Sequence, residues 1–257
     1  MDMLINKANG LLSIEFNRLA RKNAITGAMY TSMAEALLDA EQDPAVRVVL
    51  IAGKPEIFTA GNDLDDFLNN AGAGAMTEDR PVFQFMRALE SCTKPVIAAV
   101  AGAAVGIGTT MLMHCDLVYC ADNAKFSMPF TQLGLCPEFA SSLLVTQAAG
   151  YTRAAEKLML GEAFGAMEAF EMGIVARVLP AAELRAFAEQ QAAKLIALPA
   201  ASIRATKALM RRSRAALVAD TIAVENKQFG AMLVAPEAKE AFTAFFEKRK
   251  PDFSKFD

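Results

Sequence analysis

Two short loops rich in small residues are the first parts of this 257-residue chain that could do chemistry. They read TAGNDL at positions 59–64 and GAAVGIG at 102–108, and each follows an apolar run typical of a buried strand. Small residues let a ligand approach the main chain, and free N–H groups at a helix start attract negative charge. Together the loops predict two N–H donors around one oxygen, an oxyanion hole, although either loop alone is better explained by tight turns and close packing.

Glu138 is the carboxylate placed best for acid–base chemistry, in the run LGLCPEFASS at 133–142. Pro137 suits the first position of a helix, so Glu138 is expected in the first turn. Apolar neighbours raise the pKa of a carboxyl group by desolvation, while a helix start lowers it. That opposition suits a general base, whereas the simpler alternative is an ordinary glutamate at a helix start. The expected apolar neighbours are Phe130, Leu133, Leu135 and Phe139.

Several other motifs are absent or favour a structural interpretation. Gly106-Ile107-Gly108 lacks the third glycine of a dinucleotide fingerprint, because Met111 stands there, and no G-K-[ST] follows to make a P-loop. His114 is the single histidine, which excludes an H-E-x-x-H zinc site and leaves at most one Ser-His-Asp triad. Ser141 and Ser142 lack a G-x-S-x-G context. His114 could border the site, but a buried, hydrogen-bonded histidine is the favoured interpretation.

The composition predicts one large domain, or one domain with a small appendage. Hydrophobic residues make up 54% of the chain and charged residues 21%, which argues against disorder, and the net charge of −3 argues against nucleic-acid binding.

No C-x-x-C pair occurs among the four cysteines and no secretory signal opens the chain, so a reduced, cytoplasmic protein is expected. Residues 95–113 are uncharged, but we expect a strand, a glycine loop and a helix there rather than a membrane span.

The elements that must position these residues alternate between strand and helix. A hairpin is predicted around Asn9-Gly10, and the alternation implies a largely parallel sheet with covered faces. From position 137 onward the pattern is mainly helical, and a boundary near Leu198-Pro199 divides a core, 1–198, from a helical region, 199–257. The other predicted elements are a helix over 26–43 capped by Thr26, a loop over 58–64, a helix over 80–91, and strands over 46–52, 95–100, 116–120 and 174–179.

The order of the motifs FTAGNDL, AAVAGAAVGIG, CDLVYC and LGLCPEFASS resembles the enoyl-CoA hydratase/isomerase (crotonase) superfamily. The likeness covers nearly the whole chain. It implies an α/β fold, a spiral of ββα units followed by helices that mediate formation of a homotrimer, often paired into a hexamer. It also implies an acyl-CoA thioester as ligand, with the main-chain N–H groups of Asn62 and Ile107 as the oxyanion donors. The other substrate-binding positions that it implies are Ala60, Gly61, Asp63, Leu64, Gly106, Thr110 and Phe130.

The resemblance is strongest to peroxisomal-type Δ3,Δ2-enoyl-CoA isomerases. Typical hydratases carry two glutamates that activate and position water. At the two corresponding positions this chain has Thr110 and Phe130. The P-E-x-x-S-S run places a lone Glu138 where such isomerases shuttle a proton, with no metal and no redox cofactor. A hydratase or another crotonase-type enzyme, and a non-catalytic acyl-CoA-binding relative, stay open as alternatives. The CoA phosphates could be bound by the basic residues at 248–250, or by Arg21 or Lys22, although a solvated surface position is the simpler interpretation of each one.

Overall fold

The first two strands form the predicted hairpin. β1 (Met3–Ala8) and β2 (Leu11–Phe16) pair antiparallel, and the turn residues Asn9 and Gly10 both have positive φ, at 52° and 83°. This is the conformation that a tight hairpin turn requires and that Asn-Gly adopts most readily. β2 then pairs in parallel with β3, which joins the hairpin to the main sheet.

The main sheet has the order β1-β2-β3-β5-β7-β10 in the computed structural model, which describes residues 1–66 and 79–256. All its neighbouring strands after the hairpin are parallel, as predicted. β3 and β5 are buried at every residue, which explains their unbroken apolar sequences. These later strands are β3 (Val48–Ala52), β5 (Val96–Val100), β7 (Leu117–Ala121) and β10 (Arg177–Leu179).

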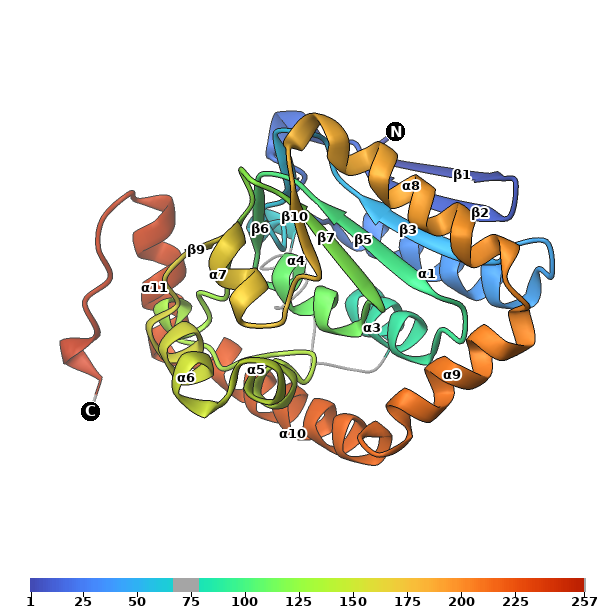
Figure 1. Ribbon diagram of the computed structural model, residues 1–257. Helices are drawn as coiled ribbons and strands as arrows, with labels where there is room; N and C mark the ends of the chain where they lie inside the picture. The colour runs from blue at the N-terminus through green and yellow to red at the C-terminus, as the bar shows by residue number, and fades with distance from the viewer. Residues whose placement is uncertain (67–78, 257) are drawn as a thin grey trace.

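A second sheet, in the order β4-β6-β8-β9, was not predicted strand by strand. Its strands are two or three residues long, so periodicity could not separate them from the loops expected over 58–64 and 102–108. β3 is followed by β4, β5 by β6 and β7 by β8, so each pair places one strand in each sheet, as a spiral of ββα units requires (Figure 1). The strands are β4 (Ile57–Thr59), β6 (Ala103–Val105), β8 (Lys125–Ser127) and β9 (Phe164–Gly165).

Helices cover both faces of the main sheet (Figure 1). α8 (Ala181–Ala197) packs on one face, where its buried residues meet Val48, Leu50 and Ala52 of β3. The intervening residues Val49 and Ile51 face the larger core, to which α1 (Gly27–Gln42) and α3 (Pro81–Ser91) contribute. Thr26 caps α1 by accepting a hydrogen bond from the N–H of Met29, as predicted.

The C-terminal helices α9, α10 and α11 run from the lower right, along the bottom, to the left of the molecule in Figure 1. Phe229 and Leu233 of α10 and Phe242 of α11 belong to the same core as the β-sheet residues. The division at position 198 stays a prediction. The remaining helices are α4 (Ile107–Thr110), α5 (Ser141–Ala149), α6 (Tyr151–Leu160), α7 (Ala166–Glu171), α9 (Ala200–Arg212), α10 (Ala215–Leu233) and α11 (Pro236–Phe246), with 3-10 turns at Leu19–Arg21, Met111–His114, Thr131–Leu133 and Phe253–Lys255.

The uncharged segment 95–113 forms β5, β6, α4 and the start of a 3-10 turn, which confirms a globular interpretation of that segment over a membrane helix. Across 1–66 and 79–256, no helix combines the length and the apolar character that spanning a bilayer would need.

Candidate active site

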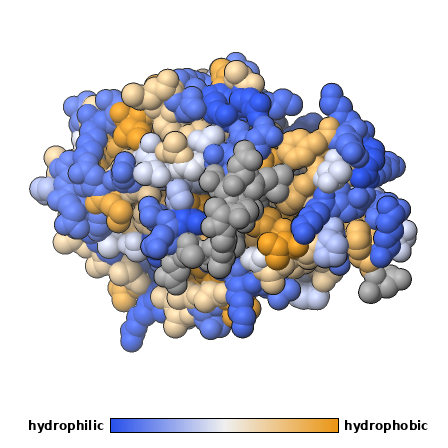
Figure 2. Space-filling view, turned by 180° about the vertical axis from the view of Figure 1, so that it is seen from behind, coloured by the Kyte–Doolittle hydropathy of each residue, from blue (hydrophilic) through white to orange (hydrophobic). Residues whose placement is uncertain are grey.

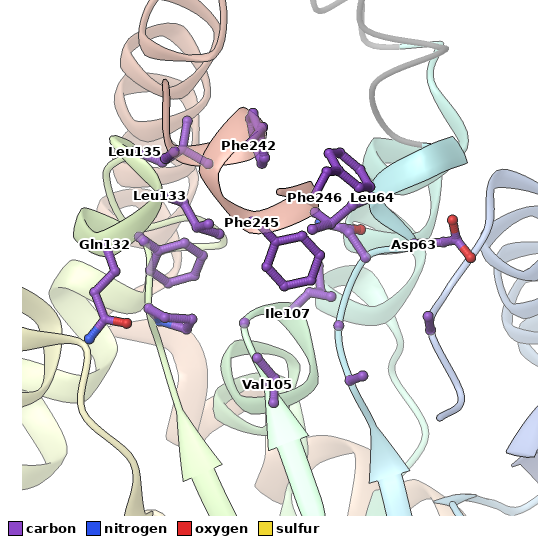
Figure 3. Close-up of a pocket in the computed structure, with 18 of the residues that line it drawn as sticks. Asp63, Leu64, Val105, Ile107, Gln132, Leu133, Leu135, Phe242, Phe245 and Phe246 are labelled. Atoms are coloured by element: carbon purple, nitrogen blue, oxygen red, sulfur yellow. The ribbon is translucent and has the colours of Figure 1, made fainter. Parts of the chain in front are cut away.

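A cavity of about 910 Å³ lies where the parallel strands β4, β6 and β8 end (Figure 3). Residues after each strand form its floor, and α10, α11 and the segment beyond them form the opposite wall. Because carboxyl ends of neighbouring parallel strands meet at one edge, loops far apart in the sequence come together here. The lining includes all the expected site residues except Thr110, namely Ala60, Gly61, Asn62, Asp63, Leu64, Gly106, Ile107, Phe130 and Glu138.

Phenylalanines dominate the wall supplied by the C-terminal helices. In Figure 3, Phe242, Phe245 and Phe246 of α11 stand opposite Leu133, Leu64 and Ile107. From behind, apolar residues gather on the side of the molecule that carries the C-terminus (Figure 2). The sequence alone does not indicate a role for these phenylalanines, because only folding brings α11 to the carboxyl ends of the short strands. The remaining phenylalanines of the lining are Phe130, Phe229 and Phe253.

The two glycine loops lie side by side through the pairing of β4 with β6. Thr59 is opposite Ala104 in this pairing, and Asn62 and Ile107 each follow three residues later. Gly61, with φ of +87°, lies so close to β6 that a Cβ atom there would come within 2.7 Å of the Val105 carbonyl oxygen. The glycine is therefore required for this approach, and the approach brings the two loops together at the cavity.

The main-chain N–H groups of Asn62 and Ile107 donate to no other described residue. Ile107 is the first residue of α4, whose N–H has no partner within the helix. Gly106 fixes this start, because its N–H donates to Ser127 O at 2.9 Å and its φ of 56° favours glycine. Two main-chain donors thus line the same cavity, the arrangement that an oxyanion hole needs.

The side chain of Asn62 is anchored by Tyr30, a contact that the sequence did not indicate. The buried hydroxyl of Tyr30 on α1 donates to Asn62 Oδ1 at 2.6 Å. Burial, followed by the charges of Glu138 and Asp66, raises the pKa of Tyr30 well above 10, so the phenol keeps its proton and acts as donor. This bond orients the loop that carries the Asn62 N–H.

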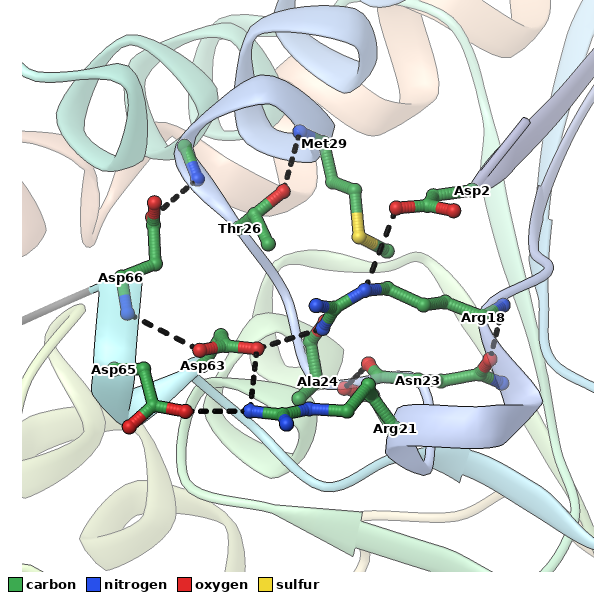
Figure 4. A network of polar contacts seen from close by, with 12 residues as sticks. Asp2, Arg18, Arg21, Asn23, Ala24, Thr26, Met29, Asp63, Asp65 and Asp66 are labelled. Atoms are coloured by element: carbon green, nitrogen blue, oxygen red, sulfur yellow. Dashed lines mark hydrogen bonds and ion pairs between the residues drawn. The ribbon is translucent and has the colours of Figure 1, made fainter.

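Asp63, which was expected to contact the substrate, lines the cavity and also anchors its loop. Its carboxylate is turned away from the phenylalanines of the cavity (Figure 3) and accepts a hydrogen bond from Arg18 at 2.7 Å, with Arg21 3.7 Å away (Figure 4). Burial would raise the pKa of Asp63, but hydrogen bonds from Arg18 and the Asp66 N–H, with the charges of both arginines, lower it below its usual value. Asp63 is therefore an anchor of the loop and a weak base.

Glu138 is the lining carboxylate that suits a base. It is 5% exposed, and its Oε1 has no hydrogen-bond partner among the described residues. Burial, and secondly the charge of Glu225, raise the pKa of Glu138 from 4.5 to about 8. A buried carboxyl group without a partner is costly to keep ionised, so Glu138 accepts a proton more readily than an exposed glutamate does.

The expected helix start at Pro137 is wrong. α5 begins at Ser141, and Glu138 precedes it in a turn where Phe139 and Ala140 have φ of 58° and 56°. These left-handed conformations are costly for residues with a Cβ atom and were not predictable from Pro137. Glu138 therefore lies outside the helix, and the predicted lowering of its pKa by the helix start is not found.

His114 supports this turn rather than entering the cavity. Its Nε2 lies 2.8 Å from the Phe139 carbonyl oxygen, and the two rings stack with centroids 3.7 Å apart and an interplanar angle of 11°. Burial, opposed by this hydrogen bond, lowers the pKa of His114 to about 3. The expectation of a buried, hydrogen-bonded histidine is confirmed, and a neutral His114 donates from Nε2 to the carbonyl.

Cations lie at the rim of the cavity. Arg21 pairs with Asp65 at 2.6 Å, and Arg249 pairs with Glu240 and Glu247. Lys250 also lines the rim and forms no ion pair with the described residues. Among those residues no group of histidine, cysteine, aspartate or glutamate side chains is arranged to hold a metal ion.

A family model described as "Enoyl-CoA hydratase/isomerase" matches residues 6–255. The chain belongs to this family. A crystal structure of an enoyl-CoA hydratase/isomerase from Pseudoalteromonas atlantica T6c is similar with a TM-score of 0.93 and 37% identity, covering 99% of this chain and 100% of the other. The crotonase-like fold expected from the resemblance is thereby confirmed.

Named relatives of this family point to two activities. The 2,3-dehydroadipyl-CoA hydratase of Escherichia coli K12 is 29% identical over 252 residues, covering 98% of each chain. The peroxisomal enoyl-CoA delta isomerase 3 of Mus musculus is 36% identical over 182 residues, covering 70% of this chain and 57% of its own. The family is therefore established, and the choice between these activities depends on the site residues.

The two positions expected to carry hydratase glutamates differ in their surroundings. Phe130 lines the cavity and is almost completely buried. Thr110 is fully buried, does not line the cavity, and has an Oγ1 without a partner among the described residues. Its expected substrate contact is therefore not supported, and neither position supplies a carboxylate.

Proposed function

We propose that this protein is a Δ3,Δ2-enoyl-CoA isomerase, in which Glu138 moves one proton between two carbons of an acyl-CoA thioester. The observation that carries this proposal is the buried carboxylate of Glu138, whose Oε1 has no partner among residues 1–66 and 79–256. It lies in an apolar cavity that is also lined by Asn62 and Ile107, whose N–H groups donate to no described residue. The other lining carboxylates, Asp63 and Asp65, are paired with arginines.

The chemistry begins with removal of the C2 proton of a 3-enoyl-CoA. That proton lies between a carbonyl group and an alkene, so its loss gives a dienolate whose charge extends to the thioester oxygen. The N–H groups of Asn62 and Ile107 would stabilise this oxygen as its charge develops. Glu138, raised in pKa by burial, is a stronger base than an exposed glutamate once ionised.

Return of the same proton to C4 leaves the 2-enoyl product. One carboxylate suffices when both carbons present the same face to it. Phe130 occupies a position at which the activation of water would need a carboxylate. The phenylalanines of α11 add further apolar surface to the cavity wall. An apolar wall disfavours ordered water beside the dienolate, which favours proton return over hydration.

Hydration of a 2-enoyl-CoA is the second candidate, because the E. coli relative that spans nearly the whole chain is named a hydratase. Glu138 would then activate water without a second carboxylate. A non-catalytic acyl-CoA-binding role is disfavoured, because binding alone gains nothing from a buried carboxyl group that is costly to ionise.

The CoA phosphates would be held at the rim, where Lys250 forms no ion pair with a described residue and Arg21 lies nearby.

The oligomer that we propose is a homotrimer, or a hexamer built as a dimer of trimers. Exposed apolar side chains support this assembly: Leu209, Met210 and Val224 are 69%, 72% and 61% exposed. Light scattering of the purified protein measures the mass of the oligomer.

The four cysteines are free thiols, in keeping with the cytoplasmic location that we propose.

Purified protein incubated separately with 3-hexenoyl-CoA and 2-hexenoyl-CoA tests the function. We expect the conjugated thioester absorbance to rise with the first substrate and to change little with the second. Rapid loss of that absorbance from the second substrate, with no shift of the first, would favour the hydratase. Glu138→Gln serves as the control for reaction outside this site.

A further inference from the structure

Glu225 on α10 reaches across to the turn that carries Glu138. Its Oε2 accepts a hydrogen bond from the Ala140 N–H at 2.6 Å, and its Oε1 accepts one from the Ser142 N–H at 3.0 Å. The hydroxyl of Ser142 donates to Oε1 as well. α5 has no side-chain cap of its own, because Ala140 stands at the N-cap position. A carboxylate 85 residues further along the chain supplies that cap instead.

The turn depends on such support because of its backbone. Phe139 and Ala140 both have positive φ, and residues with a Cβ atom hold that conformation only where the surroundings impose it. His114 holds Phe139 through its ring and carbonyl, and the Ser141 hydroxyl donates to the Glu138 carbonyl at 2.6 Å. Glu225 holds the next residue, Ala140, and the first turn of α5.

The burial of Glu225 makes these bonds hard to replace. The residue is 6% exposed, so water is poorly placed to substitute for its oxygens or for the two N–H groups. Burial raises the pKa of Glu225, opposed by the hydrogen bonds from Ser142 and Ala140, which favour the charged form. Among the residues that the structure describes, the titratable groups that face Glu225 are Glu138 and Cys136. Burial raises the pKa of each, and the charge of Glu225 raises it further.

We propose that Glu225 is a positioning residue, which clamps the strained turn at Phe139–Ala140 so that the Glu138 carboxylate stays aimed into the cavity. This inference rests on the proposed role of Glu138 as the base. Glu225 does not line the cavity, so it acts through the turn and not by contact with substrate. A small displacement of a catalytic group is enough to slow the step that it performs.

Glu225→Gln keeps the size of the side chain but turns one acceptor into a donor, and Glu225→Ala removes both acceptors. We expect kcat to fall about 10–100-fold in Glu225→Gln and further in Glu225→Ala, with KM within about 3-fold of wild type. Loss of the negative charge also moves the midpoint of the kcat/KM–pH profile downward, because the charge raises the pKa of Glu138. Asp220→Asn, an exposed carboxylate on the same helix, is the matched control and should leave all three quantities unchanged.

Ser142→Ala provides a milder variant if Glu225 variants fold poorly. It removes one donor to Glu225 and leaves both N–H groups, so a partial loss of kcat without a change of KM is expected. Wild-type kcat in well-folded Glu225→Gln, while Glu138→Gln is inactive, would overturn the positioning role and leave the proposed function intact.

Failure of the proposed function itself would give a different result. If wild-type protein converts neither substrate, nuclear magnetic resonance titration of the Glu138 carboxyl group still decides the inference. The titration midpoint of Glu138 should fall in Glu225→Gln, and the Ala140 and Ser142 amides should exchange faster than in Asp220→Asn. An unchanged Glu138 midpoint and unchanged exchange would overturn the inference.

Discussion

The proposed oxyanion side and the proposed base side of this cavity are built in different ways. On the oxyanion side, the pairing of β4 with β6 sets the positions of Asn62 and Ile107, and the proposed donors are their main-chain N–H groups. On the base side, Glu138 lies in an irregular turn that is held by side chains of His114, Ser141 and Glu225.

This difference predicts how each side responds to substitution. A main-chain donor survives every change of its own side chain except proline. A side-chain base held by other side chains is lost directly by one substitution and misplaced by others. The side chains of Asn62 and Ile107 should therefore tolerate most replacements, whereas Glu138 and the side chains that hold its turn should not.

Glu138→Gln should produce the largest effect on turnover. Glutamine keeps the size and most of the packing of glutamate but cannot accept the proton, so isomerisation should fall by about 10²–10⁴-fold. Binding of the acyl-CoA product, measured by calorimetry, should persist because the N–H donors and the rim cations lie elsewhere. An intact rate would mean that Glu138 is not the base.

Ile107→Pro should be the next most damaging change, and it attacks the oxyanion side at its main chain. Proline is tolerated at the first position of a helix but has no N–H, so kcat should fall by about 10²–10³-fold. Ile107→Ala removes most of the same side chain and keeps the N–H, which makes it the matched control. Equal rates in folded Ile107→Pro and Ile107→Ala would remove Ile107 from the oxyanion hole.

Asn62→Ala should have a smaller effect, because the main-chain N–H remains. The variant loses the bond from Tyr30, so a reduction in kcat of less than about 10-fold is expected from a less ordered loop. Tyr30→Phe removes the same bond from the other partner and should match it. A loss as severe as that of Glu138→Gln would mean that the amide side chain of Asn62 itself takes part in the reaction.

Salt should produce the smallest effect, at the rim and away from both sides. Raising the ionic strength screens the attraction between Lys250 or Arg21 and the CoA phosphates, so KM should rise a few-fold while kcat changes little. Steady-state kinetics between about 0.05 and 0.5 M salt measure both constants. A KM that is indifferent to salt would assign binding to apolar and main-chain contacts.

Local sequence patterns predicted the parallel sheet, both glycine loops and Glu138. They missed what depends on distant packing, such as Tyr30 behind Asn62, Glu225 behind Glu138, and the phenylalanines of α11. Pro137 indicated a helix start, but Phe139 and Ala140 have positive φ, which is not helical. The helix therefore begins only at Ser141. Strands of three residues, such as β4 and β6, carry too few positions for a period to show.

The protonation of Glu138 is the measurement that tests the central claim most directly. In the proposed mechanism the ionised form of Glu138 is reactive. Its pKa of about 8 lies above the usual value, so activity should rise with pH until that carboxyl group has lost its proton. Infrared spectra of wild type minus Glu138→Gln, taken between about pH 5 and 10, follow the carboxyl group alone while kcat/KM is measured in parallel. We predict one shared midpoint near 8, with kcat/KM falling about tenfold per pH unit below it. A carboxyl midpoint near 4.5, or a kinetic midpoint that Glu138 does not share, would contradict the account.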